Sequence, residues 1–280
     1  MYIRKGATEL STENKGYSIA TENTEKQKKS KLPVLLMLLA LLILIGCGVY
    51  VGSMFMQEQS AKASYGEIAE IASGSSKPQG GSSSQSSPVD LESLRKINSD
   101  VYAWIRIPGT HVDYPIAQST VNDNYYLHRS IYKKYLFAGM IYTQSCNSLS
   151  FNDPVTVVYG HNMRSTTMFS TLHYFEDPAF FEKHDTFYIY TVDRMLTYKI
   201  ISAYKYDSRH IMNSFNFANP QELSSFQQHT LNPLSTLRNV RSGITLDADS
   251  KIVVLSTCMS NDKSSRYLVN GVLISDVPIS

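Results

Sequence analysis

Apolar residues fall into one long uninterrupted run near the start of the chain and many short runs after it. Residues 32–56 carry no charged side chain, and 34–45 are almost wholly aliphatic. An α-helix rises about 1.5 Å per residue, so about 20 such residues cross a hydrocarbon core of roughly 30 Å. The pattern therefore predicts a transmembrane helix at 32–56.

Charge on the two sides of this run predicts its orientation. Residues 1–31 are polar without apolar periodicity, which is typical of a disordered tail. The tail ends in four lysines, Lys26, Lys28, Lys29 and Lys31, whereas the far side has mixed charge. The positive-inside rule then puts the tail in the cytoplasm and the remainder outside, anchored once in the plasma membrane. A cleaved signal peptide is the alternative, with Ala61-Lys62-Ala63 as the cleavage site, but the run is too long and the site too distant.

A polar segment separates the span from the rest of the chain. Residues 57–72 are compatible with a short helix, and 73–87 are rich in Ser and Gly. We interpret 57–87 as a flexible extracellular tether, and its Ser/Gly-rich part, 73–87, has an r.m.s. span of about 20 Å. The folded domain is then expected at 88–280.

The folded domain begins with a helical signal and continues with strand signals. Ser87 and Pro88 suit an N-cap and first helical position, and Leu91, Leu94 and Ile97 follow at helical spacing. After this helix come β-branched and aromatic runs separated by turn residues. These strand-like runs cover residues 104–107, 112–115, 139–142, 154–159, 186–190, 195–204, 252–258 and 266–274.

Two further helical patterns interrupt the strands, at 166–175 and 220–229. The chain shows neither internal repeats nor an alternation of strands and helices. We therefore predict a mainly β fold, a closed antiparallel β-barrel with an N-terminal helix and a helix-bearing insertion before the strand that ends at Cys258.

Composition narrows the chemistry. The formal net charge of +2 gives no signal for nucleic acid, and no such partner is expected. Nineteen tyrosines and three cysteines indicate a β-rich fold that does not depend on disulfides. Cys47 lies in the apolar run, which leaves Cys146 and Cys258. A disulfide between these two would exclude a nucleophilic Cys258, and the sequence leaves that open.

Cys258 and Arg266 occupy the facing ends of a predicted hairpin. Cys258 ends one apolar strand, and Arg266 begins the next after a short polar loop. Directly opposed residues in such a hairpin have Cβ atoms about 5 Å apart. A guanidinium beside a thiol favours the nucleophilic thiolate and can hydrogen-bond an oxyanion. The alternative is a buried structural cysteine beside a solvated arginine.

A thiolate nucleophile needs an imidazole that delivers a proton to the leaving group. Among seven histidines, His161 differs because it follows an apolar strand directly, after Gly160. Strand ends on a rigid scaffold are frequent positions for active-site residues. A histidine in a turn taken alone is more often an ordinary polar loop residue.

The combination of these residues resembles the sortases, membrane-anchored cysteine transpeptidases of Gram-positive bacteria. The resemblance rests on Val-Val-Tyr-Gly-His-Asn-Met at 157–163, Leu-Ser-Thr-Cys at 255–258 and Arg266, and it covers about 88–280. The N-terminal helix, the insertion at about 205–240 and the sequences at 183–184 and 201–204 are similar to class B.

The resemblance implies roles for individual residues. Cys258 is expected to attack the carbonyl after the Thr of a C-terminal sorting motif, His161 to protonate the leaving amine, and Arg266 to stabilise the oxyanion. Substrate-binding positions are expected at Leu127, Ser256, Ser208, Ile211 and Met212. Ser256 shares a strand face with Cys258, while Thr257 points away. The resemblance implies neither a metal nor an organic cofactor.

Three residues close to His161 or Cys258 in the sequence leave questions open. Asp262 could pair with Arg266 or His161 as a catalytic third member, although the family gives that place to Arg; Asn162, the residue after His161, has no assigned role. Met259 stands where some class B members have an acidic residue, which puts that subsite's substrate preference in doubt.

The expected partners are secreted proteins with a sorting motif and an acceptor amine. A peptidoglycan cross-bridge would make the protein a wall-anchoring enzyme, which we favour, and a pilin lysine would make it a pilus polymerase. Two rivals are a catalytically slow protein that binds sorting signals and a hydrolytic cysteine protease of the same fold.

Overall fold

The computed structural model describes residues 31–73, 87–260, 262 and 264–279. The chain divides into two compact units, Met1–Val49 and Tyr50–Ser280. The predicted tail, apart from Lys31, and most of the predicted Ser/Gly-rich linker lie outside the described residues.

Helix α1 (Leu32–Ser73) contains the predicted span. Its most apolar 18-residue window has a mean hydropathy of 2.9 and none of that window is buried, so the helix is long and apolar enough to cross a membrane. It is a candidate membrane anchor.

The last three turns of α1 are part of the folded unit. Ala61, Tyr65, Ile68 and Ala72 form a stripe at helical spacing and are buried in the main core. Tyr65 also donates a hydrogen bond to the carbonyl of Gly139, and its ring meets Tyr114 edge-on at 5.1 Å. Residues 57–73 therefore differ from the flexible tether that we expected there, because this stripe has apolar surface to bury.

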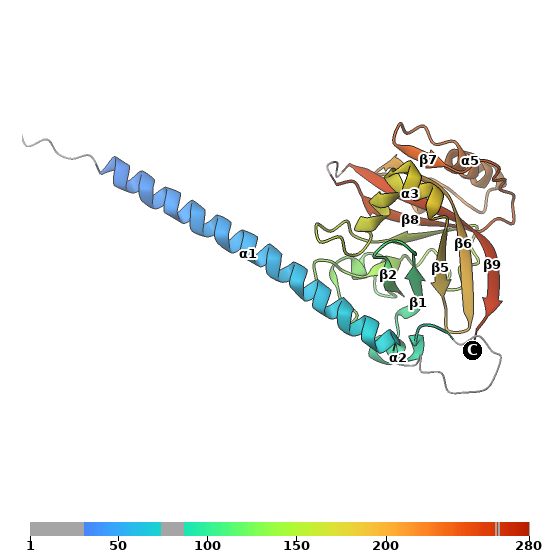
Figure 1. Cartoon of the computed structure of the whole chain (residues 1–280), viewed down its shortest axis with the longest axis horizontal. Coiled ribbons are helices and arrows are strands. Elements are labelled where there is room, and N and C mark those ends of the chain that lie inside the picture. The colour runs from blue at the N-terminus through green and yellow to red at the C-terminus, as the bar shows by residue number, and fades with distance from the viewer. Residues whose placement is uncertain (1–30, 74–86, 261, 263, 280) are drawn as a thin grey trace, which may run out of the picture. The chain divides into compact units, whose positions relative to one another are not determined.

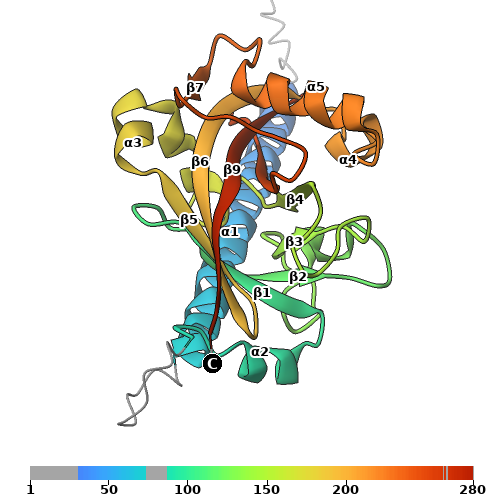
Figure 2. The same cartoon turned by 90° about the vertical axis from the view of Figure 1, so that its right-hand side faces the viewer.

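Within the described residues, nine strands make up the sheet that carries the site. They are β1 (Val101–Arg106), β2 (Asp113–Gln118), β3 (Ile141–Thr143), β4 (Val155–Tyr159), β5 (Thr186–Tyr190), β6 (Arg194–Asp207), β7 (Arg238–Val240), β8 (Ile252–Cys258) and β9 (Ser265–Pro278). Their order is β5-β1-β2-β3-β4-β8-β9-β6-β7, and an additional β5–β6 pairing closes eight of them into a barrel. The mainly β, closed-barrel prediction is confirmed (Figure 2).

The barrel is mixed, whereas we expected an antiparallel one. β2 pairs with β3 in parallel, and so does β4 with β8. Long connections separate both pairs, so neither partner follows its neighbour through a hairpin turn. Strand direction there is decided by closure of the barrel, which short-range sequence patterns do not report.

Short helices flank the barrel at both ends (Figure 1). They are α2 (Leu91–Ile97), the 3-10 helices η1 (Tyr125–His128) and η2 (Ser170–Glu176), α3 (Pro178–Lys183), α4 (Ile211–Ser214) and α5 (Pro220–Leu231). The predicted N-terminal helix is present, but Asp90 caps it through a bond to the Ser93 amide at 3.0 Å, so it starts later than Ser87 and Pro88 suggested. α4 and α5 lie between β6 and β8, which confirms the helix-bearing insertion.

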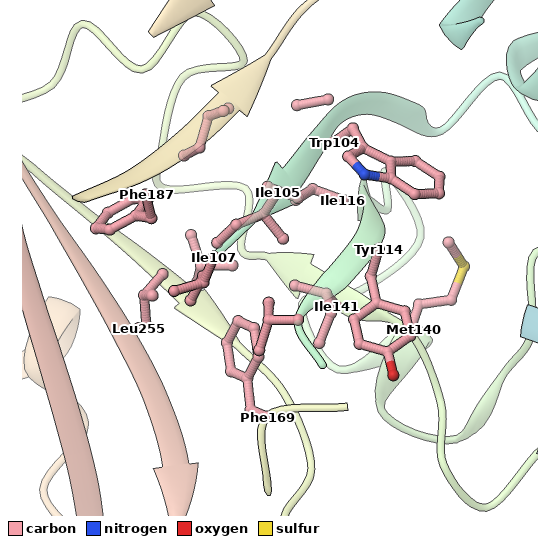
Figure 3. Close-up of a cluster of buried hydrophobic side chains, with 14 of the residues drawn as sticks. Trp104, Ile105, Ile107, Tyr114, Ile116, Met140, Ile141, Phe169, Phe187 and Leu255 are labelled. Atoms are coloured by element: carbon pink, nitrogen blue, oxygen red, sulfur yellow. The ribbon is translucent and has the colours of Figure 1, made fainter. Parts of the chain in front are cut away.

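Two apolar clusters support the barrel. The larger one joins side chains of the barrel strands to the buried stripe of α1 and includes Trp104, Ile105, Phe169, Phe187 and Leu255, drawn in Figure 3. The smaller one lies between the barrel wall and the insertion, where Leu223 and Phe226 of α5 pack on Val157 and Val254. β4 and β8 are therefore buried on both faces, which explains their continuous apolar sequences.

Candidate active site

Cys258, His161 and Arg266 line one groove of about 230 Å³. It lies where β4, β8 and β9 meet the η1 turn and the segment after β6. Sequence analysis selected Cys258 and Arg266 as a hairpin pair and His161 separately, and the fold brings all three together.

Cys258 and Arg266 are direct partners in the antiparallel β8–β9 register. The apolar run that ends at Cys258 forms β8, and the loop that follows returns the chain at Ser265. Cys258 is half-buried and, like the other two cysteines, is not in a disulfide. The predicted juxtaposition of thiol and guanidinium is therefore present, and the open question about a Cys146–Cys258 bond is answered.

Arg266 places positive charge in the groove. Burial raises the pKa of Tyr142 to about 12, while the charge of Arg266 acts in the opposite direction on the same hydroxyl. The same charge opposes the larger effect of burial on the pKa of Tyr159, whose ring stacks on Tyr142 at 5.5 Å. An anion formed beside Cys258 would lie in this positive field.

The parallel pairing of β4 with β8 brings His161 to the cysteine. Tyr159 pairs with Ser256, and the Gly160 amide donates to the Ser256 carbonyl at 3.1 Å. Parallel strands end at the same sheet edge, so the residues that follow β4 lie beside the end of β8. Only glycine fits at position 160, because a Cβ there would come within 2.5 Å of the Ile141 side chain and 2.7 Å of the Phe169 ring.

The imidazole of His161 is oriented by a backbone carbonyl. Its Nε2 lies 2.8 Å from Leu127 O, and a carbonyl only accepts, so Nε2 carries the proton in the neutral ring. Nδ1 is then the basic nitrogen. Burial lowers the pKa of His161, the Leu127 bond opposes this, and the charge on nearby His128 lowers it further. The ring is therefore biased toward the neutral form, which can accept a proton.

A side-chain network that sequence analysis missed holds the carbonyl of Cys258. Asn162 Nδ2 donates to it at 2.9 Å, and His173 Nε2 lies 3.0 Å from the same oxygen. The other nitrogen of His173 lies 2.5 Å from Glu176 Oε1, and the His173 ring stacks on Tyr267 at 5.0 Å. His173 looked like an ordinary helix residue in the sequence, and no local pattern links η2 to the end of β8.

Four of the five expected substrate-binding residues line the groove: Leu127, Ser256, Ser208 and Ile211. Met212 is not among the residues that line it; its partly buried side chain packs on the smaller core cluster. Ser256 is 5% exposed and Thr257 2%, and Thr257 also borders the groove although we expected it to point away.

The groove also contains polar residues that we did not predict. Gln144 Oε1 and Tyr159 Oη are buried and have no hydrogen-bond partner within the part of the chain that the structure describes. Buried polar atoms are normally satisfied, so unpaired ones at a groove indicate a ligand position. The apolar strand run that ends at Tyr159, just before His161, was a signal for that residue, whereas Gln144 stood in an uninformative loop.

Asp262 is engaged in the loop rather than with His161. It bonds Lys205 Nζ at 2.9 Å and Ser265 Oγ at 2.6 Å, and it also binds the amide and hydroxyl of Ser264. These bonds hold the pKa of its carboxyl well below the usual range. The geometry fits a residue that closes the β8–β9 loop. Among the described residues, no group of three or more His, Cys, Asp or Glu side chains is arranged to hold a metal ion.

Comparison with known proteins bears on this site. A family model described as the sortase domain matches residues 105–274. Sortase B of Listeria monocytogenes is 29% identical over 194 residues, 66% of this chain and 74% of the relative. The structure of sortase B from Bacillus anthracis in complex with AAEK1 is 25% identical with a TM-score of 0.67, covering 79% of this chain and 99% of that one. A Streptococcus pyogenes class B sortase involved in pilus biogenesis is 31% identical with a TM-score of 0.57, covering 66% and 98%.

These matches give the class of protein, the cysteine transpeptidases, and a closed barrel with a thiol in its groove agrees with that class. The chain belongs to the sortase family, and its relatives place it in class B. It is therefore an enzyme that acts on sorting-signal substrates and amine nucleophiles, in the general task of anchoring proteins to the cell wall.

Proposed function

We propose that Cys258 is the nucleophile, that His161 transfers the protons, and that Arg266 stabilises the oxyanion. The observation that carries this proposal is the β8–β9 register, in which Cys258 directly faces Arg266 inside the groove that His161 also lines.

In the first half-reaction the thiol proton passes to His161, and the thiolate attacks the carbonyl carbon after the Thr of the sorting motif. The carbonyl oxygen becomes an oxyanion, which accepts hydrogen bonds from Arg266. When the intermediate collapses, the C–N bond breaks and His161 gives its proton to the leaving amine. A thioester on Cys258 remains.

In the second half-reaction an amine attacks the thioester. His161 takes a proton from the incoming nitrogen, the C–S bond breaks, and the thiolate leaves. A new amide joins the cleaved protein to the acceptor. Because its pKa is lowered, His161 is available as a base at neutral pH.

For the acceptor we propose a peptidoglycan amine. Support comes from the general task of the family in wall anchoring. The second candidate is a pilin lysine, which the pilus-linked Streptococcus pyogenes relative favours at 31% identity. For location we propose a cytoplasmic N-terminus and an external catalytic domain, because the lysines that precede the span are expected on the cytoplasmic side.

The test uses the full chain in detergent with sorting-motif peptides and candidate amines, analysed by mass spectrometry. We expect a thioacyl adduct on Cys258 and an amine-joined product, both lost in Cys258→Ala. Arg266→Lys keeps the charge but loses the planar fork and should lower kcat/KM by about 10²- to 10³-fold. If peptides bind but Cys258 stays unmodified, the protein is a binding scaffold; release by water alone would make it a protease.

A further inference from the structure

Three aromatic side chains form an outward-facing surface beside His161, here called the aromatic shelf: His128, Tyr135 and Phe137. The rings of His128 and Phe137 each stack on the His161 ring, at 5.2 and 5.7 Å between centroids. His128 also stacks on Phe137 at 5.6 Å and meets Tyr135 at 6.3 Å. The shelf is thus continuous with the proposed general base.

A tight hairpin presents the shelf to solvent. Arg129 and Tyr135 form a bridge, the Leu136 amide donates to the His128 carbonyl at 3.1 Å, and Lys133 turns the chain at a φ of 60°. Leu136 points into the core, 8% exposed, while Tyr135 is 71% and Phe137 41% exposed. Packing of the inward side chains holds the aromatic ones outward, so their exposure is built into the hairpin.

His161 lines the groove and is also the residue on which the shelf rings stack, but the shelf and the groove have no other residue in common. The groove contains Cys258 and Leu127, and none of the three shelf residues lines it. Leu127 and His128 are consecutive residues of η1: Leu127 lines the groove, and His128 belongs to the shelf. Once a sorting motif occupies the groove as a thioester, an incoming amine has to reach His161 from another side, and the shelf is a surface that leads there.

Charge on the shelf hairpin has one sign. Residues 128–140 contain Arg129, Lys133 and Lys134 and no acidic residue. Lys133 is paired with Asp100 at 3.1 Å, while the exposed guanidinium of Arg129 lies over Tyr125 at 4.4 Å. Lys134 is exposed. Aromatic rings bordered by positive charge suit a ligand that combines apolar faces with carboxylates.

We propose that the aromatic shelf is the docking site of the acceptor substrate, and that this acceptor is a glycopeptide of the peptidoglycan type. Its amino sugars offer apolar C–H faces to Tyr135 and Phe137, and its peptide carboxylates face Arg129 and Lys134. This assignment rests on the proposed function, because the shelf has a role only if a thioester on Cys258 awaits an amine.

The test compares full-length Tyr135→Ser with the parent chain in detergent. Thioester formation is followed by mass spectrometry of the intact protein, and transfer is measured to a soluble disaccharide-peptide with a free amine and to hydroxylamine. We expect Tyr135→Ser to raise the KM for the disaccharide-peptide about three- to tenfold, the range of one aromatic contact. Thioester formation and transfer to hydroxylamine should not change, since neither needs the shelf.

Tyr174→Ser is the matched control, because Tyr174 is an exposed tyrosine of η2, 40% exposed and packed on Phe180 rather than on the shelf. It should leave all three measurements unchanged. A charge arm uses Lys134→Gln, which should raise the KM for the acidic disaccharide-peptide but not for its amidated form.

An unchanged KM in Tyr135→Ser would overturn the docking site. Transfer to a pilin-derived lysine peptide, with none to the disaccharide-peptide, would overturn the acceptor class. A parent chain without any thioester on Cys258 would instead refute the proposed function, so the two failures are distinguishable.

Discussion

At the scale of single residues, hydrogen bonds hold the backbone carbonyl of Cys258, while its side chain lines the groove. Asn162 is the residue after His161, and its amide donates to the Cys258 carbonyl and, at 3.1 Å, to Ser260 Oγ. The residue that follows the proposed base therefore fixes the residue that carries the proposed nucleophile. We infer that Asn162 is a positioning residue.

Replacing Asn162 by Asp keeps the shape and removes the donor. One net hydrogen bond is worth about 1 kcal/mol, so we expect kcat/KM to fall about fivefold, with a further loss from repulsion between the carboxylate and the Cys258 carbonyl. KM for the sorting peptide should stay near the parent value, and kcat should carry the change. The exposed Asn213→Asp is the control; a purely structural role would lower the melting temperature of Asn162→Asp without this kcat effect.

His128 offers a test of the electrostatics around His161. Its charge contributes to the lowered pKa of His161, so His128→Gln should move that pKa upward toward the ordinary value of 6.5. The midpoint is measured by NMR titration of the His161 ring, and His111→Gln is the control. A downward or absent shift would contradict this account.

The sign for stability follows from the same pKa. The folded chain binds a proton at His161 less readily than the unfolded chain does, so protonation favours unfolding. The stability that the folded chain gains from a neutral His161 is present above about pH 6.5, the unperturbed pKa, and is lost as the pH falls below it. In His128→Gln the loss should be smaller.

At the scale of elements, the end of α1 and the η1 turn are connected. Gly139, whose carbonyl accepts from Tyr65, approaches Leu127 so closely that a Cβ would lie 2.2 Å from the Leu127 carbonyl oxygen. That oxygen is the acceptor for His161. Positive φ at Gly139, 57°, adds to the requirement for glycine there.

Ile68 tests the packing of α1 on the barrel. It is 1% exposed, and Ile68→Ser removes its apolar contacts and buries a hydroxyl. We expect the free energy of unfolding to fall by about 2–4 kcal/mol and the melting temperature of the folded unit by roughly 5–15 °C. Circular dichroism of the full chain in detergent measures this. Glu70→Ser, at an exposed position two residues on, should change little; equal melting temperatures would show that 61–72 do not belong to the folded unit.

At the scale of the whole molecule, the features that could be predicted from the sequence are those that depend on residues close together in the chain. The span, the β8–β9 hairpin and helix α5 were readable because periodicity, turn residues and caps act within a few residues. The stripe at 61, 65, 68 and 72 was also readable as a helical pattern, but a pattern does not say whether a helix face meets protein or solvent. The expectation of antiparallel pairing was wrong for β4 and β8. These two strands lie about 100 residues apart in the sequence, so no local pattern indicates how they pair.

The sequence by itself determined that a thiol and a guanidinium face each other at the end of a hairpin, since a short loop leaves antiparallel strands little choice of register. Only the tertiary structure decided that His161 joins them, because that depends on the parallel β4–β8 pairing and on barrel closure. It also brought His173 to the Cys258 carbonyl and placed His128, Tyr135 and Phe137 on the outer side of His161. Such contacts join segments whose separation along the chain carries no local signal, so packing of the whole barrel determines them.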